Sequence, residues 1–419
     1  MSMLYLTGKN ANLLKRATVT ASPSALAAYP VAGLSDDDPG TPFVFGSLAN
    51  DSNIPIDFGT LVNRNFEEAL ATGWTDASVA GGTASRESTI GPDDYSNSGT
   101  YGCKLTAADA THAGSVYQTI EAAAGEYRRL GCYAKTISGT PDFYFIIYNN
   151  RTGKYWNGAT WTSTPSGATV TGTLSGAFSF LYVLYRVEDF ETCRADAVNM
   201  RVQFVNASAA PSTVAIDDAE DVPGVNFSAI IGHNLGHAVS VVQFDPAGVY
   251  SGAHTNISQH TITSGAFYST FAMSYCASWR VIFTGTNHEA PCIGELILGQ
   301  YQTALTGMKW NFETHETFPS ARNIGPTGRT SQYNLTEHPI RSLSMNFSAR
   351  STANAAELMN SLWRRSGQGR YPTIIVPIDT EADVYYGHLT EPIVQRRRFV
   401  AIYESSMRLQ GAPLQCLAS

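Results

Sequence analysis

Short segments in which every second residue is apolar or aromatic recur along this chain, with Gly, Pro, Asp, Ser and Thr between them. In residues 54–59, for example, Ile54, Ile56 and Phe58 face one way. Because successive side chains of a strand point to opposite faces, this alternation predicts strands with one buried face. The 36 Gly, 21 Tyr and 19 Phe suit short strands joined by many turns. The sequence therefore predicts a mainly β chain.

Length and composition limit the number of domains and the kinds of partner. At roughly 100–200 residues per domain, the 419 residues predict two to four domains. Apolar residues make up 43% and charged residues 15%, which indicates packed cores rather than a disordered polymer. The net charge of −8 and the absence of a basic stripe argue against a nucleic-acid partner. We interpret the run Arg396 to Arg398 as a solvated strand edge or a subunit contact.

The sequence has no pattern typical of export, membrane insertion or metal binding by cysteine. Residues 1–19 lack the apolar core of a signal peptide, and no apolar run approaches the 18 residues of a membrane span. None of the six cysteines forms a CxxC pair. We therefore expect a protein that is assembled in cytoplasm with free thiols and without disulfides.

Residues 351–367 are the clearest helical segment. The apolar residues that fall on one helical face are Leu358, Met359, Leu362 and Trp363. Gly367 is placed to end the helix, because glycine adopts the left-handed conformation that a helix C-terminus often needs. Strand-like segments precede and follow this helix.

Catalytic motifs are missing. The sequence contains no GxSxG, Walker A or GxGxxG motif. His233 and His237 have the spacing of zinc ligands on a helix, but no Glu follows His233, so we interpret His233 as a packed or hydrogen-bonded residue. Neighbouring carboxylates of a strand point to opposite faces and cannot flank one sugar bond. Such pairs are Asp93-Asp94, Asp217-Asp218 and Glu67-Glu68. We therefore predict a non-enzymatic protein.

Five phrases resemble a discoidin (galactose-binding-like) domain and occur in the order of that family. They are YPVAGLSDDDPGTPF, IPIDFG, IIGHNLG, WRVIFTG and IGELILG. About 160 residues separate the second phrase from the third, which indicates an inserted domain. The resemblance implies a discoidin-like β-sandwich made of residues 1–62 and 223–299, interrupted by residues 63–222.

The insert, residues 63–222, resembles a jelly-roll carbohydrate-binding module of the kind that accompanies xylanases. The phrases that carry this resemblance are NRNFEEALATGW at its start and TVAIDDAEDV at its end. The resemblance implies a structural calcium ion near Glu67 and Asp217, although both can equally be ordinary surface carboxylates. No cofactor is required otherwise.

Aromatic residues in or beside the loops of the insert are candidates for sugar contacts, because aromatic faces stack on the C–H face of a sugar ring. The candidates are Tyr95, Tyr101, Trp156 and Trp161. For all of them the alternative is a place in the core or in a strand, and Trp74 in particular is expected to be a core residue.

The remaining part, residues 300–419, looks like a phage virion protein. Its order of strand, helix, strand, PIDTEADVYYGHL and a long strand resembles the β-barrel-plus-helix ring subunits of phage tails. The resemblance implies a homo-oligomeric ring, other tail proteins as partners, and a place in the virion tail after assembly in the host cytoplasm. We expect a structural component of the tail tip whose outward modules bind host-surface polysaccharide. The alternatives are a free carbohydrate-binding or adhesion protein and, less favoured, a glycan-degrading enzyme.

Overall fold

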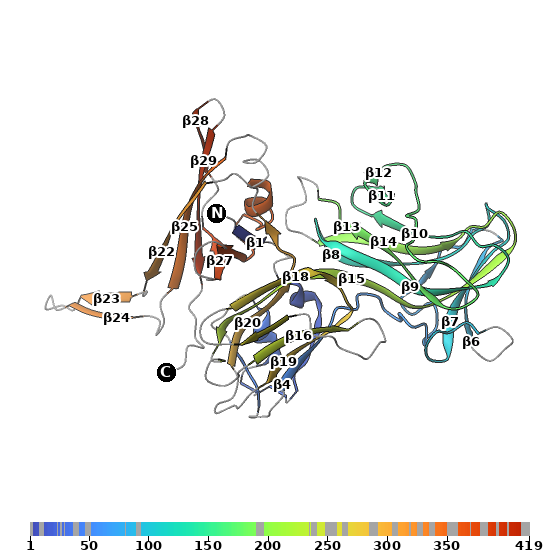
Figure 1. Cartoon of the computed structure of the whole chain (residues 1–419), viewed down its shortest axis with the longest axis horizontal. Helices are drawn as coiled ribbons and strands as arrows, with labels where there is room; N and C mark the ends of the chain where they lie inside the picture. The colour runs from blue at the N-terminus through green and yellow to red at the C-terminus, as the bar shows by residue number, and fades with distance from the viewer. Residues whose placement is uncertain are drawn as a thin grey trace.

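The computed structural model is built almost entirely from antiparallel strands, as the alternating pattern predicts (Figure 1). The residues that it describes are 3–7, 12–22, 24–25, 27–28, 30–36, 42–46, 52–79, 81–88, 94–189, 197–233, 235, 241–247, 258–261, 267–284, 292–303, 309–317, 320–324, 330–334, 340–349, 359–368, 370–377, 384–390, 394–399 and 402–411. Within these ranges, no helix has the length and hydropathy to cross a membrane.

Two facing sheets form a β-sandwich from the middle of the chain. The first sheet has the order β12 (Trp161–Thr162), β11 (Lys154–Trp156), β10 (Phe143–Asn149), β14 (Ala197–Asn206), β8 (Gly114–Ala123) and β5 (Thr75–Asp76). The second contains β13 (Ser179–Arg186), β9 (Tyr127–Ser138), β15 (Ser212–His233), β7 (Tyr101–Ala107) and β6 (Thr83–Ser88). Their inner faces bury one apolar core, to which Phe66, Trp74, Phe145 and Phe204 belong. The predicted core position of Trp74 is confirmed.

A second sandwich forms around the other half of β15. That half pairs with β18 (Phe267–Tyr275) and β20 (Cys292–Gly299), and β20 pairs with β3 (Phe43–Val44). The facing sheet has the order β17 (Ser258–Thr261), β16 (Val241–Ala247), β19 (Ser278–Thr284), β4 (Ser52–Asp57) and β2 (Thr18–Val19). The core between the sheets includes Phe43, Phe58, Trp279 and Phe283. Short 3-10 helices at Leu13–Arg16 and Val31–Leu34 flank it.

The remaining strands form an open sheet and not the barrel that the sequence predicts. Its order is β21 (Gln302–Thr303), β1 (Met3–Thr7), β26 (Thr373–Pro377), β27 (Tyr385–Leu389), β29 (Ile402–Gly411), β25 (Ile340–Ala349) and β22 (Lys309–Thr317). The outermost strands of this order, β21 and β22, do not pair with each other. β28 (Val394–Phe399) pairs with β29, and β23 (Ser320–Ile324) pairs with β24 (Thr330–Asn334) as a separate hairpin.

The first strand of the chain belongs to this last sheet. β1 pairs with β26 along its whole length, although the sequence groups these residues with the discoidin-like unit. Leu4 and Leu6 pack with Ile374 and Val376, and the same cluster contains Phe227 of β15. The apolar side chains of β1 are therefore buried where the open sheet meets the second sandwich.

The predicted helix is present as a short π-helix, Met359–Arg364. Leu362 is buried and Trp363 is half-buried, while Leu358 lies outside the described residues. Gly367 has a φ of +63°, and its N–H donates to the carbonyl of Arg364. Gly367 thus follows the helix in the left-handed conformation, as predicted.

β15 is a single strand of 22 residues that joins the two sandwiches without a linker. Its first part pairs with β7 and β9, and its last part pairs with β18 and β20. The Thr60 hydroxyl donates to the carbonyl of Asp221, so the two ends of segment 63–222 lie side by side. An inserted domain requires this proximity. The division into three domains with the predicted boundaries stays a prediction.

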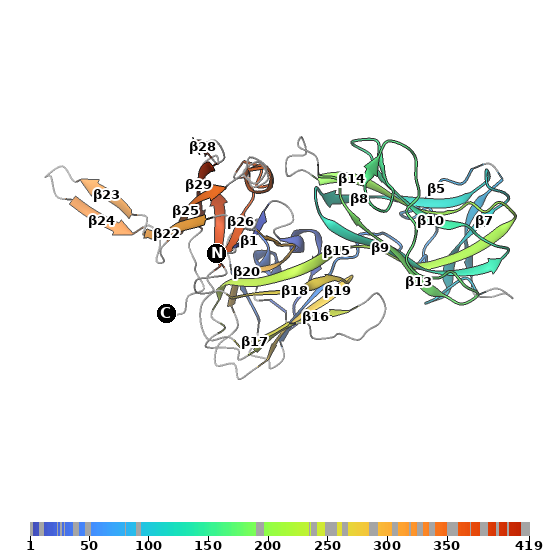
Figure 2. The ribbon, with the colours of Figure 1, turned by 45° about the horizontal axis from the view of Figure 1, so that its top comes forward.

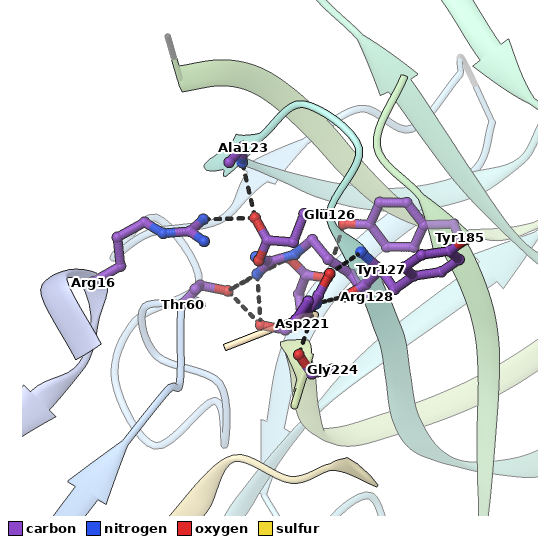
Figure 3. A network of polar contacts seen from close by, with 10 residues as sticks. Arg16, Thr60, Ala123, Glu126, Tyr127, Arg128, Tyr185, Asp221 and Gly224 are labelled. Carbon is purple, nitrogen blue, oxygen red and sulfur yellow. Dashed lines mark hydrogen bonds and ion pairs between the residues drawn. The ribbon is translucent and has the colours of Figure 1, made fainter. Parts of the chain in front are cut away.

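A buried network of charges lies where the two sandwiches meet (Figure 3). The Arg128 guanidinium, which has no exposed surface, donates to Asp221 Oδ2 at 2.8 and 3.0 Å and to Glu126 Oε1 at 2.6 Å. Arg16 donates to the second Glu126 oxygen at 2.8 Å, and Tyr185 donates to Asp221 Oδ1 at 2.9 Å. Residues from four separate stretches of the chain are therefore fixed by one set of charge-assisted hydrogen bonds.

The expectation of free thiols throughout is wrong. Cys103, Cys132 and Cys276 are free. Cys292, at the start of β20, is disulfide-bonded, and its partner lies outside the described residues. The spacing of the cysteines gave no sign of this bond, because a disulfide depends on distance in the fold and not on separation in the sequence.

Candidate functional site

Tyrosines gather on the outward face of the first sheet of the middle sandwich. On β10, Phe143, Phe145 and Ile147 point into the core, so the intervening Tyr144, Ile146 and Tyr148 point outward. The same alternation on β14 buries Val202 and Phe204 and turns Arg201 outward. These side chains stand on a sheet whose opposite face is packed, which holds their backbone in place.

The strand register brings the outward side chains together. Tyr148 lies opposite Tyr155 of β11 on one side and opposite Arg201 on the other. The rings of Tyr148 and Tyr155 are 4.7 Å apart. The Arg201 guanidinium carbon lies 4.9 Å from the Tyr148 ring centre and 5.3 Å from that of Tyr117 on β8. We call Tyr117, Tyr148, Tyr155 and Arg201 the tyrosine face.

The tyrosine face runs across four neighbouring strands, so its length is about 14 Å at the usual strand spacing. All four of its side chains are half-buried. Polar groups flank it: Gln203 lies opposite Tyr117 and donates to the Ser115 hydroxyl at 3.1 Å, and Thr119 lies opposite Arg201. The sandwich that carries this face projects to one side of the rest of the chain (Figure 2).

Arg201 forms no ion pair with any carboxylate in the described part of the chain, and its Nε has no hydrogen-bond acceptor there. The rings of Tyr117 and Tyr148 lie beside its guanidinium. An arginine over an aromatic face is held by cation–π attraction and keeps the edge of its guanidinium for other acceptors. The tyrosine face therefore combines ring surfaces with hydrogen-bond donors.

The predicted sugar-contact residues of the β11–β12 hairpin lie against the core. Trp156 is buried and belongs to the core of the sandwich, and Trp161 packs on that core from the side. Their rings are 5.7 Å apart, and the Trp161 Nε1 donates to the carbonyl of Arg186 at 2.9 Å. Sugar contact by either tryptophan stays a prediction.

Tyr95 and Tyr101 lie at the other sheet of the sandwich and are half-buried. The Lys104 ammonium lies 5.5 Å from the Tyr95 ring centre. The Arg86 guanidinium lies 3.3 Å from the Tyr101 ring centre. The two tryptophans and the two tyrosines thus belong to opposite sheets of the sandwich, and sugar contact by Tyr95 or Tyr101 stays a prediction.

Glu67 and Asp217, the predicted calcium ligands, hold the same loop. Asp217 Oδ2 accepts from the backbone N–H of Asn97 at 2.7 Å and of Ser98 at 2.9 Å. Glu67 Oε1 accepts from the N–H of Thr100 at 2.6 Å. Burial raises the pKa of Asp217 to about 7, because the loop amides only partly replace the lost water.

The fit of calcium to this loop is poor in the present arrangement. Calcium takes six to eight oxygen ligands, whereas the described residues contain no group of three or more acidic, His or Cys side chains able to hold a metal. The carbonyls of Phe66 and Glu67, which are further oxygen donors nearby, accept from the Arg86 guanidinium. The two carboxylates hold the loop in place by accepting from its backbone N–H groups. Calcium there remains a prediction.

His233 is buried, and its Nδ1 accepts from the N–H of Leu235 at 3.2 Å. The interpretation of His233 as a hydrogen-bonded residue is therefore confirmed. His237 lies outside the described residues.

The sequence does carry a signal for the tyrosine face, which our prediction missed. In residues 142–149, Asp142, Tyr144 and Tyr148 stand at every second or fourth position, and this spacing places the two tyrosines on the same side of a strand as Asp142. Arg201 and Tyr117 become their neighbours only through pairing of strands that are far apart in sequence. That register is not readable from one strand alone.

No protein-family model and no curated protein sequence matches this chain. Among solved structures, the enzymatically active domain of tailspike protein 4 from bacteriophage CBA120 is 16% identical, over 40% of this chain and 21% of that one, with a TM-score of 0.29. The CBM22 tandem domain of Xyn10C from Paenibacillus barcinonensis is 10% identical, over 59% and 99%, with a TM-score of 0.27. TmCBM61 in complex with β-1,4-galactotriose is 17% identical, over 39% and 98%, with a TM-score of 0.26. This chain spans about a fifth of the length of the tailspike domain, and its fold rests on the strands and cores described above.

Proposed function

We propose that the middle sandwich binds a carbohydrate chain on the tyrosine face. The observation that supports this is the row of Tyr155, Tyr148 and Arg201 on adjacent strands, with Tyr117 beside it. Tyrosine rings offer flat apolar surface for the C–H face of a sugar, and the polar groups around them suit its hydroxyls. Because the strands are fixed by the core beneath, little order has to be gained on binding.

The test is binding of the whole chain to a panel of bacterial and plant polysaccharides by affinity electrophoresis and calorimetry. Tyr148→Ala is expected to weaken binding roughly tenfold or more, because it removes the central ring of the row. The matched control is Tyr182→Ala, which removes a half-buried tyrosine of the opposite sheet. Binding to no polysaccharide, or equal loss in the two variants, would contradict the proposal.

We also propose that the chain is a non-enzymatic structural component of a phage virion, in the tail tip, as the resemblance of residues 300–419 implies. One feature of the open sheet supports assembly. β22 is a nine-residue strand at the end of the sheet order, and its second edge has no partner strand in the described part of the chain. An open edge is a pairing site, and head-to-tail pairing of identical subunits gives a ring. Immunogold labelling of virions with an antibody against this chain tests the location.

A free adhesion protein and a glycan-degrading enzyme are the competing functions. The mass of the protein in solution distinguishes a ring subunit from a free adhesion protein, because a ring subunit assembles and a lone lectin need not. Release of reducing ends from a polysaccharide that the protein binds would establish the second.

A further inference from the structure

We propose that the tyrosine face takes an acidic polysaccharide and that Arg201 binds a carboxylate of its sugar units. This inference rests on the proposed carbohydrate binding and adds the class of glycan. The observation behind it is the positive charge of Arg201, which has no carboxylate partner among the described residues.

Arg201 lies in the middle of the face and not at its rim. Its strand, β14, has β10 on one side and β8 on the other, and each of these strands contributes a ring beside the guanidinium. A sugar chain stacked on Tyr155 and Tyr148 therefore passes over Arg201 on its way toward Tyr117.

Two other arginines of the same sandwich have carboxylate partners. Arg128 pairs with Glu126 and Asp221, and Arg129 pairs with Glu220. Arg201 has none in the described residues, and its buried Nε lacks an acceptor. A buried donor without a partner is unfavourable, so an acceptor supplied by a ligand gains more here than at an exposed arginine.

The geometry of the guanidinium selects the class of acceptor. Its N–H groups form a planar fork that matches the two oxygens of a carboxylate, and such charge-assisted pairs are stronger than bonds to neutral hydroxyls. The rings of Tyr117 and Tyr148 fix the plane of the fork before the ligand arrives. A uronic acid, which joins a sugar ring to a carboxylate, satisfies both parts of the face.

A further charged group on this face is Glu121, on β8. It is exposed and lies opposite Asn199, two residue pairs beyond the pair of Arg201 and Thr119. Glu121 repels an acidic chain at that end of β8. A uronate is therefore expected over Arg201, Tyr117 and Gln203, with the chain continuing toward Tyr155.

The experiment compares each acidic polysaccharide with its own carboxyl-reduced form, in which the carboxylate becomes a neutral alcohol and the backbone is unchanged. The probes are polygalacturonate, alginate and hyaluronate, with the whole chain, in low salt and in 0.5 M salt. Carboxyl reduction is expected to weaken binding of at least one polymer roughly tenfold or more, and salt to weaken only the acidic form.

Arg201→Gln should bind the acidic and reduced forms equally, Arg201→Lys should keep part of the preference, and Tyr148→Ala should weaken both forms. An unchanged melting temperature shows that each variant is folded.

If the protein binds both forms equally well, or if Arg201→Gln keeps the full preference, the acidic-glycan inference is overturned and carbohydrate binding stands. If neither these polymers nor the wider panel bind, the proposed function fails as well. Binding of a sulfated polymer alone would also contradict a carboxylate ligand.

Discussion

Arg128 has no exposed surface, yet it remains charged inside the protein. Burial by itself would lower its pKa, but Asp221 and Glu126 lie against the guanidinium and raise the pKa well above its usual value. Each of these three groups depends on the others, because a buried charge without its counter-charge is far costlier than a pair.

Replacing Arg128 with Met is therefore expected to destabilise the protein by roughly 3–5 kcal/mol, since it leaves Asp221 buried without its counter-charge and Glu126 with Arg16 as its one cationic partner among the described residues. Denaturant unfolding measures this change. The control is Arg186→Met, because the side chains of Arg186 and Asp189 are 39% and 35% exposed and solvent-accessible pairs contribute about 1 kcal/mol or less. Similar losses in the two variants would show that the buried network is not what holds this junction.

The stability of the middle sandwich should fall as pH rises through neutrality. Burial raises the pKa of Glu220 to about 7 against the opposing effect of Arg129, and it raises the pKa of Asp217 to about 7 as well. A raised folded-state pKa means that the contribution is present below about pH 4 and is lost as pH rises through about 7. Melting temperatures between pH 5 and pH 8 should decrease in the wild type and decrease less in Glu220→Gln. Glu68→Gln, at an exposed carboxylate, should follow the wild type.

Calcium at Glu67 and Asp217 predicts that a chelator lowers the melting temperature, because a ligand that binds only the folded state stabilises it. Glu67→Gln should then be insensitive to chelator, whereas Glu68→Gln should respond like the wild type. If the wild type does not respond, the two carboxylates hold the loop around Ser98 without a metal.

At the residue scale, the sequence correctly predicted those features that depend on neighbouring residues along the chain. Trp74 was assigned correctly to the core, and His233 correctly to a hydrogen bond. Arg201 and Tyr117 were missed, because 84 residues separate them and only the pairing of β8 with β14 makes them neighbours.

β15 couples the unfolding of the two sandwiches, because the strand belongs to both. Since the predicted boundary at residues 222 and 223 falls inside this strand, the two sandwiches should unfold in one transition. Inserting four Gly/Ser residues after Val222 should split the transition or lower its midpoint by several degrees, because it interrupts the strand between its pairs with β9 and its pairs with β18 and β20. The same insertion after Gly158, whose surroundings are open, should leave the midpoint unchanged. Equal effects of the two insertions would contradict the role of β15.

A strand or helix was predictable where its own residues carried the whole sequence pattern. Alternation identified the strands, and Gly367 marked the end of the helix correctly. The prediction of a barrel in place of the open sheet was wrong. A barrel closes only if the outer strands β21 and β22 pair, and the sequence of neither strand shows whether they do.

At the scale of the whole molecule, the edge of β22 and the place of β1 predict the assembly state. The whole chain is expected to form a closed oligomer at micromolar concentration, measured by mass photometry. Removing residues 1–8 should abolish assembly, because it takes β1 out of the sheet between β21 and β26. A whole chain that stays strictly monomeric would count against self-driven ring formation.

The position of β1 also sets an order of events during synthesis. Met3–Thr7 is synthesised about 370 residues before its partners in β26, residues 373–377. At a translation rate of about 5–20 residues per second, this strand waits roughly 20–75 s for its place in the sheet. During that interval Leu4 and Leu6 have no apolar partner from β26, while both sandwiches are completed before the waiting ends. We therefore expect β1 to depend on a chaperone, or on burial against β15, until β26 has been synthesised.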